Sequence, residues 1–408
     1  MGDSRSAVAR SAIDLAPFRA APNVLSRHYT HFRVTERAWL TGHSHQAWPD
    51  VALIGQQRAF HDAATWIDEK WEHAAARAER VRKGFRERLG DPEGALALGA
   101  NTHELVTRWL SALPLLQRPK IVTTDAEFHS LRRQLARFGE AGLEIVQVPA
   151  APACDVGWRL AQCIDARTSA VAISLVFYTT GEIAQGLRAL ADRCRELGAE
   201  LLIDAYHALN VLPVDLFALG IEHAYVTGGG YKYMQLGEGN AFLRLPPECA
   251  LRPLLTGWWA EWRQTGSTPG DGPVFYPDGP DRFAGATYDP TSHYRAAEVL
   301  DFFARESLTP EFLAEVNRHQ RRLLTERFDA LDLDPRRVRR DLGVGSDAAT
   351  GFVSLIAPDA TRISTQLRAR GVGCDARGDR LRFGPAPYHC DTQLCDAIDQ
   401  LGELVRAS

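Results

Sequence analysis

Three residues in the middle of the chain, Asp204, His207 and Lys232, are of types that can do chemistry together. Asp204 closes the apolar run LLI, where a buried carboxylate is costly unless it faces a positive partner. Such a carboxylate can hold a heterocyclic nitrogen in its protonated form. Lys232 follows three glycines and a tyrosine, and a lysine amine that is neutral part of the time can form an imine. The spacing raises the question of which molecule binds between the carboxylate and the amine.

A phosphate-binding element is predicted at the start of a helix near residue 101. Asn101 and Thr102 follow the strand-like run LALGA, and backbone amides that open a helix can bind a phosphate. Thr180 follows another apolar run, SLVFY, so we expect it at the same sheet edge. An imine-forming lysine, a partner for a pyridine nitrogen and a phosphate cradle together describe pyridoxal 5'-phosphate (PLP). Taken singly, the aspartate could be a helix cap, the lysine a solvated charge and the glycines a turn.

The elements that must position these residues are predicted from apolar runs between residues 94 and 246. Short runs alternate with longer helical ones, which is typical of βαβ units. The predicted fold class is α/β: a large domain with a mainly parallel seven-stranded sheet, plus a smaller C-terminal α+β domain. The expected strands lie within 94–100, 120–125, 143–149, 169–177, 200–205, 223–230 and 240–246. The last two runs are too close for a helical crossover, so we expect an antiparallel strand there.

We expect three segments along the chain. Residues 1–50 would contribute to the active site and the small domain, residues 51–290 would form the large cofactor-binding domain, and residues 291–408 would form the small domain. A Gly/Pro-rich loop at 256–283 carries three tryptophans, and a loop of this length is usually functional or disordered.

Composition limits the class of protein. Of 408 residues, 45% are hydrophobic and 24% charged, and the net charge of −4 gives no basic field for nucleic acid or an anionic membrane. We find no apolar run long enough to span a membrane and no secretory signal. The seven cysteines are odd in number, widely spaced and without a CxxC pair. This pattern favours reduced thiols in the cytoplasm over disulfides or a zinc site, and no metal is expected.

Several segments resemble those of a known family. IDAYHALNVLPVDL and HAYVTGGGYKYM are similar to the core of class V, fold type I PLP-dependent enzymes, and most of all to kynureninases. FYTTGE, GWW, DRFAGAT and RFGPAPYH resemble further segments of that family in the same order. The resemblance therefore covers nearly the whole chain.

The resemblance implies a role in cofactor binding for each matching residue. Lys232 would form the imine with PLP and move the Cα proton of the substrate. Asp204 would pair with the pyridinium nitrogen, and His207 would support the ring. Tyr231 would bind the phosphate and relay protons, and the Asn101–Thr102 pair would also hold the phosphate.

Other matches concern the ring face, a second subunit and the substrate. Phe128 would stack on the ring of the cofactor. Trp258 and Thr287 match positions that reach the phosphate of the neighbouring subunit, so the resemblance implies a homodimer that shares its active sites across the interface. Arg382 would bind the α-carboxylate of an amino-acid substrate in bidentate fashion. Without these roles, Phe128 and Trp258 would be core or lid aromatics, and Arg382 a surface residue.

The sequence departs from kynureninases near the expected substrate. In WLTGHSHQAWP, His43 and His45 stand where the family has an asparagine and a leucine, and Ser44 is kept. We predict that all three bind substrate. Leu131 stands where the family has an aspartate that contacts the cofactor. Alternate residues of an extended segment point to opposite faces, so we expect an imidazole acting as acid or base rather than two histidines sharing a metal ion.

We expect a PLP-dependent hydrolase that cleaves the Cβ–Cγ bond of an aryl- or acyl-alanine, giving alanine and a carboxylic acid. A class V aminotransferase, a β-lyase or cysteine desulfurase, and a non-catalytic regulator with this fold are the alternatives. A desulfurase would need a cysteine on a mobile loop, and Cys374 and Cys390 lie in no recognisable loop motif. No GxGxxG follows an early strand, which argues against a nucleotide-dependent oxidoreductase.

Overall fold

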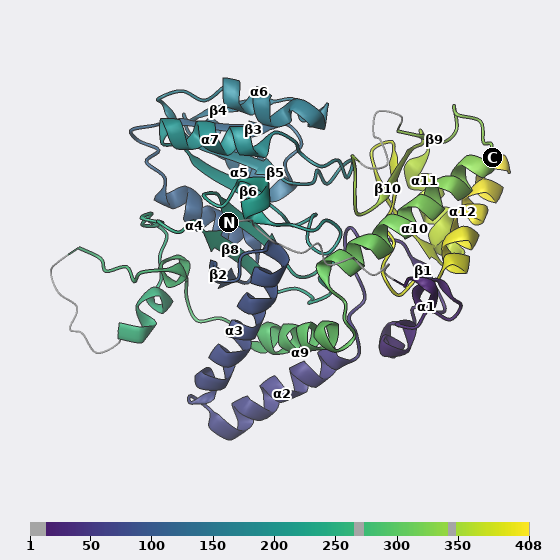
Figure 1. The fold of residues 1–408 in the computed structure, drawn as a ribbon, viewed down its shortest axis with the longest axis horizontal. Coiled ribbons are helices and arrows are strands. Elements are labelled where there is room, and N and C mark those ends of the chain that lie inside the picture. The colour runs from purple at the N-terminus through teal and green to yellow at the C-terminus, as the bar shows by residue number, and fades with distance from the viewer. Residues whose placement is uncertain (1–13, 265–272, 342–347, 408) are drawn as a thin grey trace, which may run out of the picture.

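A seven-stranded sheet forms the centre of the larger part of the molecule (Figure 1). The computed structural model describes residues 14–264, 273–341 and 348–407. The strands of this sheet are β2 (Ala95–Gly99), β3 (Lys120–Thr124), β4 (Glu144–Val148), β5 (Thr168–Ser174), β6 (Glu200–Asp204), β7 (Tyr225–Gly229) and β8 (Ala241–Leu245). Their order across the sheet is β2-β8-β7-β6-β5-β3-β4.

The directions of these strands confirm the predicted fold class. β3 pairs in parallel with β4 and β5, and β6 pairs in parallel with β5 and β7. β8 runs antiparallel to both β7 and β2, so the predicted antiparallel strand is also confirmed. β3, β5, β7 and β8 are buried along their whole length, which is why their sequences are nearly continuous apolar runs.

Helices cover both faces of the large sheet. They include α4 (Thr102–Ala112), α5 (His129–Glu140), α6 (Val156–Gln162) and α7 (Leu187–Leu197). Residues of α4 and α5 share one hydrophobic core with Ala170 and Ala172 of β5. Residues of α6 and α7 share another core with Val171 and Ile173. Alternate residues of β5 therefore face opposite layers, as the two-residue period of a strand requires.

Three further helices pack together beside this sheet, in the lower part of Figure 1: α2 (Val51–Trp66), α3 (Lys70–Leu89) and α9 (Thr291–Arg305). Leu300 and Phe303 of α9 belong to the same core as β5 residue Ile173. The division into residues 1–50, 51–290 and 291–408 stays a prediction. Because α9 packs on α2 and α3, we propose that the boundary between the domains follows α9.

The smaller part of the molecule is built on a four-stranded antiparallel sheet in the order β12-β13-β10-β9. Its strands are β9 (Arg339–Arg340), β10 (Val353–Ile356), β12 (Asp375–Arg377) and β13 (Arg380–Phe383). Its helices are α10 (Pro310–Ala330), α11 (Ala360–Ala369) and α12 (Asp391–Arg406). Residues of these three helices and of the central strands β10 and β13 share one hydrophobic core.

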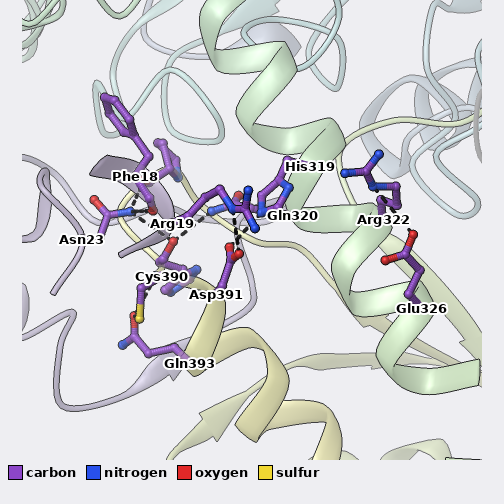
Figure 2. A network of polar contacts seen from close by, with 12 residues as sticks. Phe18, Arg19, Asn23, His319, Gln320, Arg322, Glu326, Cys390, Asp391 and Gln393 are labelled. Atoms are coloured by element: carbon purple, nitrogen blue, oxygen red, sulfur yellow. Dashed lines mark hydrogen bonds and ion pairs between the residues drawn. The ribbon is translucent and has the colours of Figure 1, made fainter. Parts of the chain in front are cut away.

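The N-terminal segment, with the short helix α1 (Ala16–Arg19), is tied to this smaller part by polar contacts (Figure 2). Asn23 donates from Nδ2 to the carbonyl oxygens of Pro387 at 2.9 Å and His389 at 3.1 Å. Arg19 donates from Nε to Asp391 at 2.9 Å. These contacts anchor the start of the chain against the residues that precede and begin α12.

The chain then runs along the small sheet. β1 (Ala38–Trp39) pairs in parallel with β11 (Val372–Gly373), and Thr41 forms a bridge to Gly384 just after β13. This pairing brings residues 41–46 beside the end of β13.

The predicted long loop, 256–283, contains two short 3₁₀ helices, η4 (Trp258–Gln264) and η5 (Pro280–Phe283). Its residues 265–272 lie outside the described residues. In the described part of the chain, no helix combines the length and hydropathy needed to cross a bilayer.

Candidate active site

The ends of two neighbouring parallel strands bring Asp204 and Lys232 together. Asp204 is the last residue of β6 and lies opposite Thr227 of β7 in the sheet. Lys232 follows β7 closely, and its Nζ lies 2.6 Å from Nε2 of His207. The predicted trio is thus brought to one edge of the sheet, where parallel α/β proteins bind ligands.

Lys232 is buried among aromatic rings. Only 4% of the residue is exposed, and Nζ lies 4.7 Å from the ring centre of Tyr206 and 4.9 Å from that of Phe128. Burial lowers the pKa of Lys232 to about 7; the charge of Asp204 opposes this shift and the charge of Arg382 adds to it. A large fraction of the amine is therefore neutral near pH 7, as imine formation requires.

Asp204 is only partly buried, and its carboxylate borders a pocket. Burial raises the pKa of Asp204, while the hydrogen bond from the Tyr206 backbone N–H, at 2.8 Å, and the charge of Lys232 lower it. A positive group in the pocket would stabilise the ionised form. A protonated ring nitrogen is such a group.

The pocket beside Asp204 is lined by residues of α4, of α5 and its N-cap, and of the strands β5, β6 and β7. It brings together three predicted cofactor-binding residues, Thr102, Phe128 and Asp204. Sequence reasoning missed five polar residues of its lining, namely His103, Thr107, Ser130, Gln134 and Thr227. Leu131, at the position of the family's aspartate, also lines it. The only signal for these lining residues in the sequence was their place on α4, on the first turns of α5 or, for Thr227, on β7.

Two buried polar atoms without partners at this site are compatible with a polar ligand. Among the described residues, Nδ1 of His207 and Oγ1 of Thr107 are buried and make no hydrogen bond. Leaving such atoms unpaired costs free energy that a bound ligand recovers. An imine-forming amine, a carboxylate, an unpaired imidazole nitrogen and a helix start with hydroxyl side chains together fit PLP.

The three glycines before Tyr231 are explained by close packing. A Cβ at Gly229 would lie 2.5 Å from the hydroxyl oxygen of Tyr206, and a Cβ at Gly230 would lie 2.7 Å from Cβ of Leu236. Neither glycine has a positive φ. The alternative that they form only a turn is therefore wrong, because Gly228 and Gly229 belong to β7 and pair with β8.

Glu127, which sequence reasoning missed, is a buried carboxylic acid directly before Phe128. It accepts hydrogen bonds from the Thr124 hydroxyl at 2.6 Å, and from the hydroxyl and backbone N–H of Ser174 at 2.6 and 3.2 Å. Burial raises the pKa of Glu127 to about 7, although these hydrogen bonds lower it. The side chain ties the ends of β3 and β5 together and so fixes the position of Phe128.

The three predicted substrate residues of the N-terminal segment are placed differently from one another. Residues 42–44 form a turn, so the assumption of an extended segment was wrong. His43 is buried against Asp375, with Nε2 3.2 Å from Oδ1. His45 is exposed and stacks on Tyr231 with ring centres 4.9 Å apart, and the Ser44 hydroxyl contacts His45 at 3.1 Å. No cluster of three metal-ligating side chains occurs among the residues that the structure describes.

Arg382 is buried close to this site. It donates to both oxygens of Asp375, and it donates from Nη1 to the carbonyl oxygen of Tyr178. The ring of Tyr178 in turn lies 5.5 Å from that of Phe128. The guanidinium is therefore held beside the pocket by Asp375 of strand β12 and by the segment that follows β5.

Four predicted cofactor-binding residues, besides His207, Tyr231 and Lys232, do not line the pocket. Trp258 donates from Nε1 to the Thr287 hydroxyl at 3.1 Å, and both residues are exposed. Thr180 borders a different cavity, and its hydroxyl accepts from the backbone of Glu182 at 3.2 Å. Asn101 caps α4 by accepting from the Glu104 N–H at 2.9 Å. The cofactor-binding roles of these four, like those of the other matched residues, stay predictions.

The fold and the site together define a PLP-dependent enzyme of fold type I. The family model described as class-V aminotransferase matches residues 71–235. Kynureninase from Pseudomonas fluorescens is 30% identical over 393 residues, which cover 90% of this chain and 89% of the relative. Cysteine desulfurase IscS from Rickettsia africae is 23% identical over 70% of both chains.

Solved structures agree on the fold. A variant of C-DES with glycine covalently linked to its PLP cofactor matches with a TM-score of 0.79 at 18% identity, over 92% of this chain and 98% of that one. The apo cysteine desulfurase from Thermococcus onnurineus NA1 matches with a TM-score of 0.77 at 16% identity, over 95% and 98%. This chain belongs to the class-V aminotransferase family of PLP-dependent enzymes. Its cofactor is pyridoxal 5'-phosphate.

Proposed function

We propose that this protein hydrolyses the Cβ–Cγ bond of an aryl- or acyl-alanine such as L-kynurenine, releasing alanine and a carboxylic acid. The observation that carries the proposal is the 30% identity to a kynureninase across nearly the full length of both chains. The geometry supports it, because the charges of Asp204 and Arg382 both act on the amine of Lys232. Asp204, Lys232 and Arg382 therefore lie close enough together to bind a cofactor, to act as a base and to bind a substrate carboxylate in one site.

In this reaction each residue of the site would have its own role. PLP, when bound, supplies an electron sink for the bonds at the substrate's Cα. Lys232, with a pKa near 7, would remove and return protons at Cα, since a base is most effective when its pKa is near the working pH. Asp204 would keep the ring nitrogen protonated. Arg382 would orient the substrate through its α-carboxylate, which aligns the breaking bond.

No second function is proposed for the cysteines. Cys374 and Cys390 are both buried, and burial raises the pKa of Cys374 to about 11. Neither thiol is exposed on a loop, as transfer of sulfur would require. The similarity to cysteine desulfurases keeps that reaction as the alternative to hydrolysis.

Turnover of L-kynurenine by the PLP-loaded protein tests the proposal. We expect the visible absorbance band of the bound cofactor to change on mixing, with anthranilate fluorescence and alanine appearing in equal amounts. Pyridoxamine phosphate formed without anthranilate would replace this proposal with an aminotransferase. A cofactor band that responds to neither L-kynurenine nor 3-hydroxykynurenine would exclude both as substrates.

We also propose that the protein is a cytoplasmic homodimer. Trp258 and Thr287 contact each other and face outward, and the nearby Leu254 and Leu255 are exposed apolar residues. A second subunit would cover these side chains and receive the Trp258–Thr287 pair at its cofactor phosphate. Sedimentation should show a species of twice 45.1 kDa at micromolar concentration. A single 45.1-kDa species would contradict the dimer.

A further inference from the structure

A buried chain of polar contacts leads from the N-terminal segment to Arg382. Asp375 on β12 and Arg382 on β13 lie directly opposite each other in their antiparallel pair. Arg382 donates from Nε to Asp375 Oδ1 at 2.8 Å and from Nη2 to Oδ2 at 2.5 Å. Nε2 of His43 lies 3.2 Å from the same Oδ1. The side chain of His43 is 0% exposed and Arg382 is 3% exposed, whereas the side chain of Asp375 between them is 19% exposed.

The charges along this chain are well defined. Burial lowers the pKa of His43 to about 4, although the hydrogen bond to Asp375 raises it, so the ring is neutral at neutral pH. A neutral imidazole with one N–H donates it to Asp375 from Nε2. Burial raises the pKa of Asp375, but the hydrogen bonds from His43 and Arg382 outweigh this and hold it well below its ordinary value. Asp375 is therefore a carboxylate with two partners that fix its orientation.

Neighbouring residues fit this arrangement closely. A Cβ at position 384 would lie 2.3 Å from Nδ1 of His43, so the imidazole fits only because Gly384 has no side chain. The ring of Phe352 packs against both ends of the chain of contacts. Its centre lies 4.8 Å from that of His43 and 5.5 Å from the guanidinium carbon of Arg382. The side chains have little freedom to rotate.

Arg382 keeps two donors for a ligand. A guanidinium has five N–H groups. Two are used by Asp375, and one on Nη1 is used by the carbonyl oxygen of Tyr178 at 2.5 Å. Within the described residues, this leaves one N–H on each terminal nitrogen. One donor on each terminal nitrogen can match the two oxygens of a carboxylate.

We propose that Asp375 is a positioning residue, which holds Arg382 so that these two N–H groups face the substrate's α-carboxylate, and that His43 holds Asp375 in turn. The inference rests on the proposed function, because it assigns Arg382 to that carboxylate. In this proposal His43 acts on the substrate only through Asp375 and Arg382, and it does not contact the substrate. Arg377, whose Nε lies 3.5 Å from Asp375 and whose side chain is 57% exposed, has no part in it.

Binding of propionate to the PLP-loaded protein tests this proposal without any reaction. Propionate has the carboxylate of alanine but no amine, and propionamide is its uncharged counterpart. We expect saturation-transfer NMR titrations to show that the wild-type protein prefers propionate. Asp375→Asn should weaken propionate binding about 10- to 100-fold, because a misplaced guanidinium loses its bidentate geometry. Propionamide binding should not change, and Arg377→Gln should bind propionate like the wild type.

Asp375→Glu distinguishes a positioning role of Asp375 from a role in balancing the charge of Arg382. It also replaces Asp375→Asn as the test of the proposal if thermal unfolding shows that Asp375→Asn does not fold. The glutamate keeps the charge but displaces the guanidinium by about one methylene, so we expect weaker propionate binding. Wild-type affinity in a folded Asp375→Asn or in Asp375→Glu would overturn the proposal, as would equal binding of propionate and propionamide by the wild type. If L-kynurenine is not turned over but Asp375→Asn weakens propionate binding, the proposed function fails and the positioning role stands.

Discussion

Replacement of Lys232 by alanine is expected to reduce turnover of the substrate by about 10³- to 10⁴-fold, because it removes both the imine-forming amine and the base at Cα. The visible absorbance band of the lysine-bound cofactor should also disappear. Lys83→Ala is the matched control, since Lys83 is exposed on α3. Absorbance spectra and steady-state rates of the two variants check this expectation. Turnover by Lys232→Ala within tenfold of the wild type would contradict it.

The lowered pKa of Lys232 gives this prediction a pH dependence. An ordinary lysine has a pKa of 10.5, whereas burial lowers that of Lys232 to about 7. The reactive neutral amine therefore forms as pH rises through 7 and is nearly complete by about pH 8. The rate at which apo-protein takes up PLP should rise from pH 6 and level off above pH 8. A rate that continues to rise toward pH 10 would show that Lys232 titrates like an exposed lysine.

Replacement of Asp204 by asparagine is the second large effect that we expect. A neutral amide cannot stabilise a protonated ring nitrogen, so the cofactor loses much of its power as an electron sink. Loss of one such electrostatic contribution typically lowers the rate by about 10²- to 10³-fold. The cofactor should still bind through Lys232, with an altered absorbance spectrum.

Steady-state kinetics, absorbance spectra and thermal unfolding of Asp204→Asn test this effect. Asp215→Asn is the control, because Asp215 is an exposed aspartate that caps α8 (Leu216–Leu219), and its loss removes no pocket charge. Burial raises the pKa of Asp204, which means that the folded protein disfavours the charged carboxylate. Removing this charge should therefore not lower the unfolding temperature of Asp204→Asn. Activity of Asp204→Asn within threefold of the wild type would exclude the proposed pairing with the ring nitrogen.

The cofactor site could be predicted from the sequence because its central parts are local. Asp204 ends one apolar strand and Lys232 follows the next, and those strands are consecutive and parallel, so their ends meet at one edge. The seven-stranded sheet could be predicted for a similar reason, since strands buried on both faces have continuous apolar sequences.

Residues that depend on strand register or distant packing were not predictable in this way. Asp375 lies opposite Arg382 because the chain reverses at Gly378, which has a φ of +59°. The segment DARGDRLR contains that turn signal, so the pair could have been found by matching residues across a hairpin. Glu127 offers no comparable signal. It lies between a strand and a helix, and its burial depends on Ser174 of another strand.

The contact between His43 and Asp375 joins residues that are 332 positions apart. Every strand of the large sheet precedes residue 246, whereas Asp375 and Arg382 belong to strands made much later. Domains generally fold in order as a chain leaves the ribosome. The large sheet, with Asp204 and Lys232, can therefore form while Arg382 is still being synthesised. We infer that the residues proposed to hold the cofactor can be in place before the residue proposed to select the amino acid.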